Sequence, residues 1–287
     1  MEKTKISTDS TADIPSEICE ELNISVLPLT IQADAVEYLD GLNIVPQEFY
    51  KVLETSKKML ASSQVTVERY MKLCDKTWRK GYSDLLHVAL NSKGSGTYQA
   101  AILSRKMFYE AHPEAAGRFR IHIIDSLTYS MGYGIAVIEA AQMAKRQIPV
   151  EKIISHVQDW LAHVRPMFVP LDLKYVKKSG RISPAAAFVG DILGMKPLIT
   201  FENGEARIIT KARGIHNAIA MLARQCISER CLGTAYALVY GCNLTALSEL
   251  KEMLLQNADI PPLAEYRVGS VISMNTGPNM IGIIYRT

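Results

Sequence analysis

The sequence predicts an α/β fold in two domains, and three observations lead to this prediction. In the first half, short apolar runs of strand length alternate with longer runs of helical character. Continuous apolar strands that are each followed by a helix indicate a parallel sheet covered on both faces. After Pro166 the order becomes mixed and includes Asn203-Gly204, a strong hairpin signal. We therefore expect an N-terminal parallel sheet flanked by helices over residues 1–165 and a C-terminal mixed α/β domain over residues 166–287.

The elements of the first domain follow from local patterns. Apolar and β-branched runs predict the strands, and apolar residues at helical spacing predict the helices, two of which open at Pro15 and Pro46. The expected strands are 5–9, 24–31, 85–90 and 119–124, and the expected helices are 16–22, 46–56, 67–80, 97–110, 130–146 and 150–164.

The elements of the second domain follow in the same way. Gly180 is expected to stop one helix, and Asn203-Gly204 is expected to join the two strands of a hairpin. The expected strands are 168–171, 197–201, 205–210, 235–240, 266–274 and 280–285, and the expected helices are 172–178, 184–193, 215–229 and 245–256.

Composition narrows the classes of function. The 287 residues are 48% hydrophobic and 21% charged, with a formal net charge of +3 and no basic run longer than two residues, so nucleic-acid binding is not expected. The uncharged stretches 231–248 and 268–285 contain Gly and Asn, which disfavours membrane insertion. Five scattered cysteines without a CxxC pair, and the lack of an apolar leader, lead us to expect a cytoplasmic protein with reduced thiols.

The loop 91–97, Asn-Ser-Lys-Gly-Ser-Gly-Thr, is the first candidate for a binding site. It joins a buried strand to a helix, and its glycines allow a ligand to approach the free N–H groups of the helix start. The loop matches neither a P-loop nor GxGxxG, so a carboxylate or other anion is the expected ligand. The alternative interpretation is an ordinary turn with Thr97 as the helix N-cap.

Other polar segments have weaker local signals. Ser62-Ser63-Gln64 offers hydroxyl donors before a helix, and Asp9-Ser10 and Asp125-Ser126 follow predicted strands. Taken alone, each segment is better explained by capping of a helix or turn. The segment 275–279 and Arg181 are further candidates, with a plain turn and a solvated side chain as alternatives. No histidine stands in a metal-ligand spacing and no GxSxG elbow is present, so neither a metal site nor a catalytic residue is predicted.

Taken in order, these motifs resemble the DegV family of bacterial lipid-binding proteins. The matching segments extend from residue 7 to the C-terminal strand. They are Ser-Thr-Asp-Ser-Thr-Ala-Asp-Ile-Pro at 7–15, Ser-Ser-Gln at 62–64, Ser-Lys-Gly-Ser-Gly-Thr-Tyr-Gln-Ala at 92–100, Ile-Asp-Ser at 124–126, Lys-Ser-Gly-Arg-Ile-Ser at 178–183, Lys-Pro-Leu-Ile at 196–199 and Thr-Gly-Pro at 276–278. The resemblance implies two α/β domains that enclose one long-chain fatty acid. It also implies a binding subunit that presents the carboxylate to a separate fatty acid kinase subunit, which makes acyl phosphate from ATP.

The resemblance also implies roles for particular residues. The family's head-group residues fall on Ser62, Ser63, Ser95, Gly96, Thr97 and Asn275 of this chain. Asn275 stands where the family has a histidine, so one cationic contact is absent. Arg181 is a further candidate for the head group or for the surface that meets the kinase.

The leading hypothesis is therefore a non-catalytic fatty acid carrier without a cofactor or metal ion. One alternative is an acyl-group enzyme with Ser95 as its nucleophile, although no motif supplies a base. The other alternative is a regulatory module that responds to bound lipid.

Overall fold

The computed structural model describes residues 3–56, 60–181 and 194–287. The chain divides into two compact units, Met1–Asn43 with Ala61–Ala162 and Ile44–Leu60 with His163–Thr287. The predicted domain boundary at 165/166 stays a prediction. The short segment Ile44–Leu60 groups with the second half of the chain, which its local sequence does not indicate.

The first unit is built on a parallel sheet of four strands, which confirms the predicted fold class. Its order is β2-β1-β6-β7, so that β1 and β6 are central. The strands are β1 (Thr4–Asp9), β2 (Ser25–Leu27), β6 (Asp84–Ala89) and β7 (Arg120–Asp125). All six residues of β6 are buried, as expected for a parallel strand with helices on both faces.

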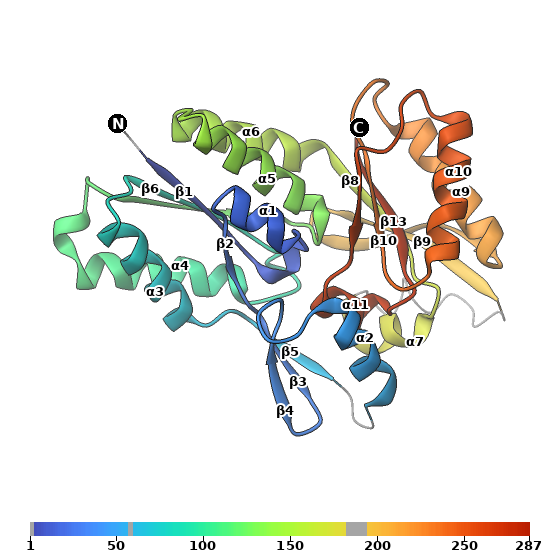
Figure 1. Cartoon of the computed structure of the whole chain (residues 1–287), viewed down its shortest axis with the longest axis horizontal. Helices are drawn as coiled ribbons and strands as arrows, with labels where there is room; N and C mark the ends of the chain where they lie inside the picture. Colours follow the sequence, from blue (N-terminus) through green and yellow to red (C-terminus); the bar gives the residue numbers. More distant parts are fainter. Residues whose placement is uncertain (1–2, 57–59, 182–193) are drawn as a thin grey trace. The chain divides into compact units, whose positions relative to one another are not determined.

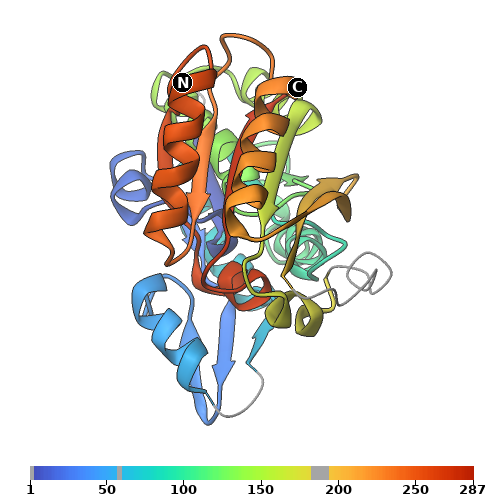
Figure 2. The same cartoon turned by 90° about the vertical axis from the view of Figure 1, so that its right-hand side faces the viewer.

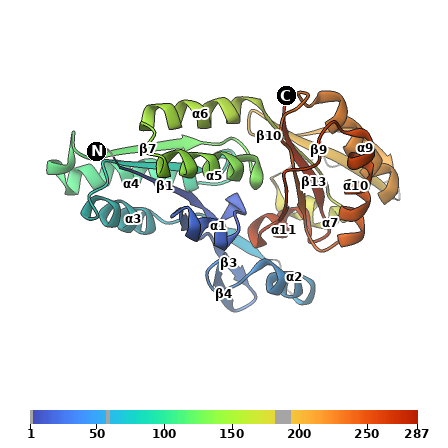
Figure 3. The same ribbon diagram turned by 45° about the horizontal axis from the view of Figure 1, so that its top comes forward.

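Helices cover both faces of this sheet. Figure 3 shows α3 and α4 on one side of the strands and α5 and α6 on the other. The Trp160 indole N–H donates to the Gly132 carbonyl at 2.8 Å and thereby links α6 to α5. The helices of the unit are α1 (Ser16–Glu21), α3 (Val67–Arg79), α4 (Thr97–Ala111), α5 (Met131–Lys145) and α6 (Val150–His163), with short 3₁₀ turns at Ser10–Ala12 and Pro113–Ala115.

A second, antiparallel sheet belongs to the same unit. Its strands are β3 (Thr30–Ala33), β4 (Val36–Leu39) and β5 (Ala61–Ser63), in the order β4-β3-β5 (Figure 1). The predicted single strand over 24–31 is wrong, because the run is divided at Pro28 between β2 of the parallel sheet and β3 of this one. Proline cannot donate to a sheet ladder, and the next amide, that of Leu29, donates to the Ser10 hydroxyl at 3.1 Å.

The second unit contains a mixed sheet of six strands in the order β10-β9-β8-β13-β11-β12. The strands are β8 (Val164–Val169), β9 (Met195–Glu202), β10 (Glu205–Arg213), β11 (Ala237–Tyr240), β12 (Ala264–Arg267) and β13 (Ile281–Arg286). The predicted hairpin is confirmed: Asn203 and Gly204 have φ of 50° and 78°, as a two-residue turn between antiparallel strands requires.

The helices of the second unit are α2 (Pro46–Thr55), α7 (Leu173–Ser179), α9 (Ile215–Glu229), α10 (Leu244–Asn257) and α11 (Ser270–Thr276). Figure 2 shows α9 and α10 side by side over one face of the sheet. The core beneath them includes Leu222, Leu250 and Ile283, which are completely buried. These contacts explain why the amphipathic patterns of both helices predicted them well.

Two predictions for this unit had different outcomes. The strand expected over 266–274 is wrong, because β12 ends at Arg267 and α11 begins at Ser270. The β-branched pair Val271-Ile272 favours a strand locally, but burial in α11 decides the conformation. The helix expected over 184–193 lies outside the described residues.

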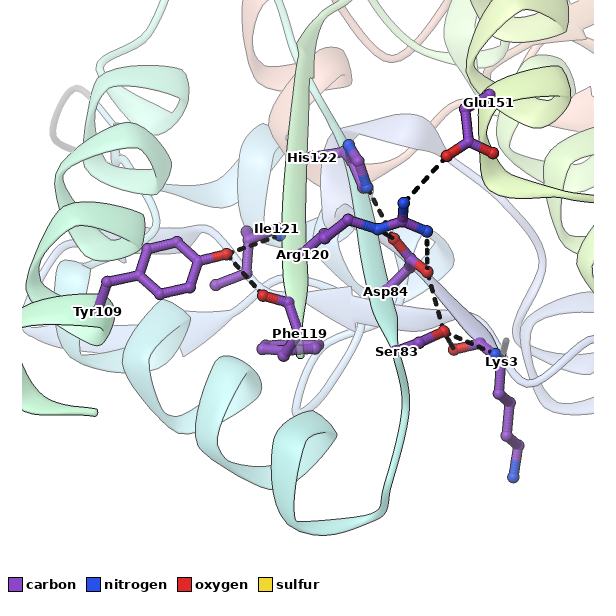
Figure 4. A network of polar contacts seen from close by, with 9 residues as sticks. All are labelled: Lys3, Ser83, Asp84, Tyr109, Phe119, Arg120, Ile121, His122 and Glu151. Atoms are coloured by element: carbon purple, nitrogen blue, oxygen red, sulfur yellow. Dashed lines mark hydrogen bonds and ion pairs between the residues drawn. The ribbon is translucent and has the colours of Figure 1, made fainter. Parts of the chain in front are cut away.

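A polar network lies at the amino ends of β6 and β7 (Figure 4). The Asp84 carboxylate, whose side chain is 0% exposed, pairs with the Arg120 guanidinium through two hydrogen bonds of 2.7 and 3.0 Å. His122 Nε2 and the Ser83 hydroxyl lie 2.9 Å from the same carboxylate. Burial alone would raise the pKa of Asp84, but these hydrogen bonds outweigh it and hold the pKa below its usual value.

Candidate functional site

The carboxyl ends of β1, β6 and β7 form the edge of the parallel sheet at which α/β proteins usually place ligands. Asp9 ends β1, and its buried carboxylate accepts hydrogen bonds from the Leu90 amide and the Tyr133 hydroxyl, both at 2.8 Å. Burial raises the pKa of Asp9, against the lowering effect of these donors. The capping interpretation of Asp9 is confirmed, because its Oδ1 also accepts from the Thr11 amide at 3.1 Å at the start of the 3₁₀ turn. The same carboxylate holds the loop that follows β6.

Asp125, at the end of β7, has the same structural role. Its Oδ1 accepts from the Ser92 and Leu127 amides, each at 3.1 Å. The buried Asn91 side chain donates to the Tyr129 hydroxyl at 3.0 Å. The start of loop 91–97 is therefore tied to the segment that follows β7, and the loop has a defined shape before any ligand binds.

Both glycines of the loop allow close approach by a neighbouring side chain. A Cβ atom on Gly94 would overlap the Tyr129 hydroxyl, and a Cβ atom on Gly96 would overlap the Gln64 side-chain oxygen. Gln64 directly follows β5, so the glycine at 96 brings this loop against the end of the small sheet. Glycine is required here for space rather than for a left-handed backbone.

Ser95 and Thr97 have different positions at the start of α4. The Ser95 hydroxyl lies 2.9 Å from the Thr97 hydroxyl and accepts from the Thr97 amide at 3.3 Å. The expectation that Thr97 is the N-cap is wrong: α4 begins at Thr97, and the Thr97 hydroxyl accepts from the Val65 amide at 3.3 Å. Thr97 is completely buried and Ser95 half-buried, so the Ser95 hydroxyl is the one that a ligand can reach.

Ser62 and Ser63 are neighbours in β5, so their side chains point to opposite faces of the small sheet. Ser62 is half-buried and lies opposite Ile31, which is fully buried, whereas Ser63 is exposed and lies opposite Thr30. The two hydroxyls therefore cannot contact one ligand from the same face. Neither caps the next helix, because Thr66 is the N-cap of α3.

The remaining predicted residues lie in the second unit, near the ends of α11 and α7. The half-buried Asn275 donates one side-chain N–H to the Val271 carbonyl at 2.7 Å, one helical turn earlier. Its segment therefore joins α11 to β13 and not two strands. Arg181 is exposed, and its guanidinium donates to the Ser179 carbonyl at 2.6 Å, which stabilises the end of α7.

Two residues that contact the loop were given no role in the sequence analysis. Gln64 belongs to the Ser-Ser-Gln motif at 62–64, and a polar amide beside two serines was the signal that could have indicated a role for it. Tyr129 had no signal, because nothing in the local sequence shows that a side chain 35 residues after Gly94 fills the space above it. Both side chains set the position of the loop.

A buried chain of hydrogen bonds links a serine to a histidine elsewhere in the first unit. The Ser7 hydroxyl lies 2.9 Å from His87 Nδ1, and the Tyr70 hydroxyl lies 2.8 Å from His87 Nε2. All three residues are buried, and burial lowers the pKa of His87 to about 3. Ser7 lies on β1, His87 on β6 and Tyr70 on α3, so these hydrogen bonds link α3 to the sheet.

The described residues contain neither a group of metal ligands nor a membrane-spanning helix. Within residues 3–56, 60–181 and 194–287, no three His, Cys, Asp or Glu side chains are grouped to hold a metal ion. Over the same ranges, no helix combines the length and the apolar character needed to span a bilayer.

Comparisons with known proteins agree on one family. A family model described as "Uncharacterised protein, DegV family" matches residues 3–287. A DegV domain-containing protein of Caldanaerobacter subterraneus is 32% identical, with 99% of each chain covered. The crystal structure of a DegV lipid binding protein from Thermotoga maritima is similar, with a TM-score of 0.83, 26% identity and coverage of 99% of this chain and 98% of that one. The structure described as fatty acid binding of a DegV family protein from Thermus thermophilus has a TM-score of 0.85, 25% identity and coverage of 99% and 100%.

Proposed function

Because the chain belongs to the DegV family, we propose that it is a non-catalytic carrier of one long-chain fatty acid. In this proposal the acyl chain lies in the protein interior, and the carboxylate is presented to a separate kinase subunit that makes acyl phosphate from ATP in the bacterial cytoplasm. The similar Thermotoga maritima and Thermus thermophilus proteins are described as lipid binding and fatty acid binding, respectively, which supports the choice of ligand.

The observation that carries the proposal is the loop at the start of α4. The half-buried Ser95 hydroxyl stands at the N-terminus of a 15-residue helix, where amide N–H groups lack partners within the helix and the helix dipole favours negative charge. Through Gln64, the same loop contacts the segment that follows Ser62. A carboxylate held here would accept hydrogen bonds from Ser95 and Ser62 and would be polarised by the helix start at Gly96 and Thr97.

The acyl chain would supply most of the affinity. A 16-carbon chain has about 14 methylenes, and at about 0.8 kcal/mol each their burial is worth about 11 kcal/mol. Association costs about 4 kcal/mol, so the acyl chain alone leaves about 7 kcal/mol, or a dissociation constant of roughly 10 μM, which hydrogen bonds to the carboxylate would lower further. The hydroxyl groups then decide the orientation and selectivity of binding.

Asn275 and Arg181 are assigned weaker roles in this proposal. Asn275 has a second side-chain N–H beyond the one donated to Val271, and this N–H is the group proposed to contact the carboxylate. Unlike histidine, asparagine cannot become cationic, so the contact would be a neutral donor to a charged acceptor. Arg181 is assigned to the head group or to the kinase-facing surface because its exposed guanidinium has further donors beyond the Ser179 contact.

Native mass spectrometry of protein purified from bacteria, followed by lipid extraction, tests the proposal. We expect a long-chain fatty acid at close to one per chain, because burial of the chain makes its loss slow. Protein stripped of lipid should bind added fatty acid in calorimetry. Empty protein that also fails to bind added fatty acid would overturn the proposal. Turnover of acyl esters that is lost in Ser95→Ala would show an enzyme instead.

A further inference from the structure

One side of β1 has a strand partner over only half of its length. β2 pairs with Ser7–Asp9, whereas among the described residues no strand pairs with Thr4–Ile6 on that side. The turn after α1 and the end of α5 flank the uncovered part, and a cavity of about 350 Å³ lies there. The shortness of β2, which has three residues, thus creates a recess at the sheet edge.

The charged side chains that line this recess are mainly basic. Among the residues that the structure describes, Lys3, Lys5 and Lys145 line it, and Glu21 supplies one carboxylate. Figure 4 shows the Lys3 side chain extending away from the Asp84 network, so its ammonium is not used there. Three ammonium groups against one carboxylate give the recess a positive charge.

The apolar part of the lining lies next to these charges. Ile6, Leu22, Ala141, Ala144 and the ring of Tyr82 contribute to the walls. A recess with a few convergent charged groups and an otherwise apolar wall is the usual form of a small-molecule site.

Lys5 is held in a fixed position within the recess. Its ammonium donates to the main-chain oxygen of Asn23 and, at 2.8 Å, to the Asn23 side-chain oxygen. Asn23 is itself held by a 3.1 Å hydrogen bond to the Tyr82 hydroxyl. Two of the three ammonium N–H groups are therefore used, and no third acceptor is recorded among the described residues.

The surroundings of Lys5 disfavour its charge. Burial, followed by the charges of Lys80 and Lys76 on α3, lowers the pKa of Lys5 to about 8. At pH 7 most of this lysine is still protonated, although it is close to other cations. An anion in the recess would compensate this charge and would accept from the remaining N–H.

We propose that this recess, the Lys5 pocket, binds a small organic anion that combines one phosphate or carboxylate group with a short apolar body. The anionic group would contact Lys5 and Lys145, and the apolar body would lie against Tyr82 and the alanines of α5. The described lining of the pocket contains none of the proposed head-group residues. The pocket lies at the amino end of β1, whereas loop 91–97 follows the carboxyl end of β6, and β1 extends about 13 Å from Lys5 to Asp9 between these two ends of the sheet. The two proposals therefore stand or fall independently.

Calorimetric titration of the full chain with phenyl phosphate, and separately with benzoate, tests the proposal. We expect saturable binding of at least one of the two at pH 7, and the stronger ligand identifies the anionic group. Lys5→Met should weaken binding tenfold or more, because a charged hydrogen bond is lost. Lys145→Met should weaken it about threefold, because this side chain is exposed. Lys106→Met on α4, where Lys106 is exposed and pairs with Glu110, is the matched control and should change nothing.

The pH dependence gives a second readout. Binding should weaken as the pH rises from 7 to 9, because Lys5 loses its proton near pH 8. The other titratable or charged groups around Lys5 are Lys3 on β1, Glu21 on α1, Lys76 and Lys80 on α3, Tyr82 before β6 and Lys145 on α5. Lys5→Met retains all of these groups. Between pH 7 and 9, ligand binding should therefore weaken less in Lys5→Met than in the wild type, and the difference measures the titration of Lys5.

Three outcomes would overturn the proposal. They are no saturable binding of either probe, equal binding by wild type and Lys5→Met, and equal weakening in Lys5→Met and Lys106→Met. Fatty acid binding by Lys5→Met should match that of the wild type, so a failure of the Lys5 pocket is distinguishable from a failure of the proposed function.

Discussion

Ser62 and Ser63 are adjacent in the sequence, but their positions in a strand give their side chains different surroundings. Both were matched to the family's head-group segment, and both are small hydroxyl donors. In β5 they point to opposite faces, and Ser62 shares its face with the buried Ile31. If a ligand lies in the interior, Ser62 is therefore the serine expected to contact it, whereas Ser63 faces the other side.

We expect Ser62→Ala to weaken fatty acid binding roughly tenfold and Ser63→Ala to leave it unchanged. The lost contact is a hydrogen bond to a charged acceptor, which is worth about 1.5 kcal/mol or more. Calorimetric titration of both variants with one fatty acid measures the difference, and each variant is the natural control for the other. Equal effects of the two substitutions would show that the ligand does not lie on the Ile31 face.

Asn275 permits a test in which charge is added to the site. In Asn275→His, a cationic ring beside the carboxylate would gain roughly 1–3 kcal/mol in binding free energy. The gain should be present below the pKa of the introduced imidazole and should fade as the pH rises and the ring deprotonates. Asn275→Ala should weaken binding by about 1 kcal/mol. Identical binding by all three proteins between pH 6 and 8 would mean that Asn275 does not contact the head group.

At the scale of elements, β1, β6 and β7 differ sharply between their two ends. Their carboxyl ends carry Asp9 and Asp125, which hold the loops that shape the candidate site. Their amino ends carry the network around Asp84, which links β6 to β7 through Arg120 and His122 (Figure 4). The carboxyl ends thus shape the candidate fatty acid site, and the network at the amino ends of β6 and β7 contributes to stability.

Stability in acid should depend on the Asp84 network. The pKa of Asp84 is lower in the folded chain than its usual value of about 3.9, so its contribution is present above pH 4 and is lost as the pH falls further. Arg120→Met leaves the buried carboxylate without its bidentate partner and should cost about 3 kcal/mol at pH 7. Urea unfolding from pH 7 to 3 should show this cost shrinking once Asp84 is protonated.

The control for this experiment is Arg118→Met, two residues earlier on the surface. It should change the free energy of unfolding by less than about 0.5 kcal/mol at every pH. A cost of Arg120→Met that stays constant down to pH 3 would show that packing of the arginine, rather than its pairing with Asp84, is responsible.

At the scale of the whole molecule, the chain passes between its two compact units three times. Within the second unit, the buried Tyr50 hydroxyl of α2 donates to the Val268 carbonyl at 2.6 Å, across 218 positions of sequence. The segment before β5 is therefore anchored on the loop that leads to α11. Segments far apart in sequence depend on one another for their packing.

Ligands should accordingly stabilise the protein in a selective way. Fatty acid added to stripped protein at 100 times its dissociation constant should raise the free energy of unfolding by about 2.7 kcal/mol. ATP should not stabilise the chain, because the loop 91–97 lacks the Walker pattern. In addition, the side chains of Tyr129 and Gln64 fill the space beside its two glycines. Thermal unfolding with each ligand measures both effects. Stabilisation by micromolar ATP would contradict the division of labour with a kinase subunit.

Three features can be predicted from the sequence alone: the α/β organisation, most of the long helices and the strand-to-helix loop at 91–97. Amphipathic helices have a strong periodic signal, and buried parallel strands are continuous apolar runs, so both patterns can be recognised from residues near one another in the chain. The helix 215–229 was predicted to the residue, and the Asn203-Gly204 hairpin was also predicted correctly. In these segments local preference and tertiary burial agree.

The short elements and the details of the site depend on contacts between residues far apart in the sequence. Val271 and Ile272 favour a strand but lie in α11, and the run 24–31 is divided between two sheets at Pro28. Short segments contribute little intrinsic preference, so distant neighbours outweigh it. Distant neighbours also explain why Gln64 and Tyr129 pack against the glycines of loop 91–97. The residues that fill the space beside a glycine need not be near it in the sequence, so the local sequence does not identify them.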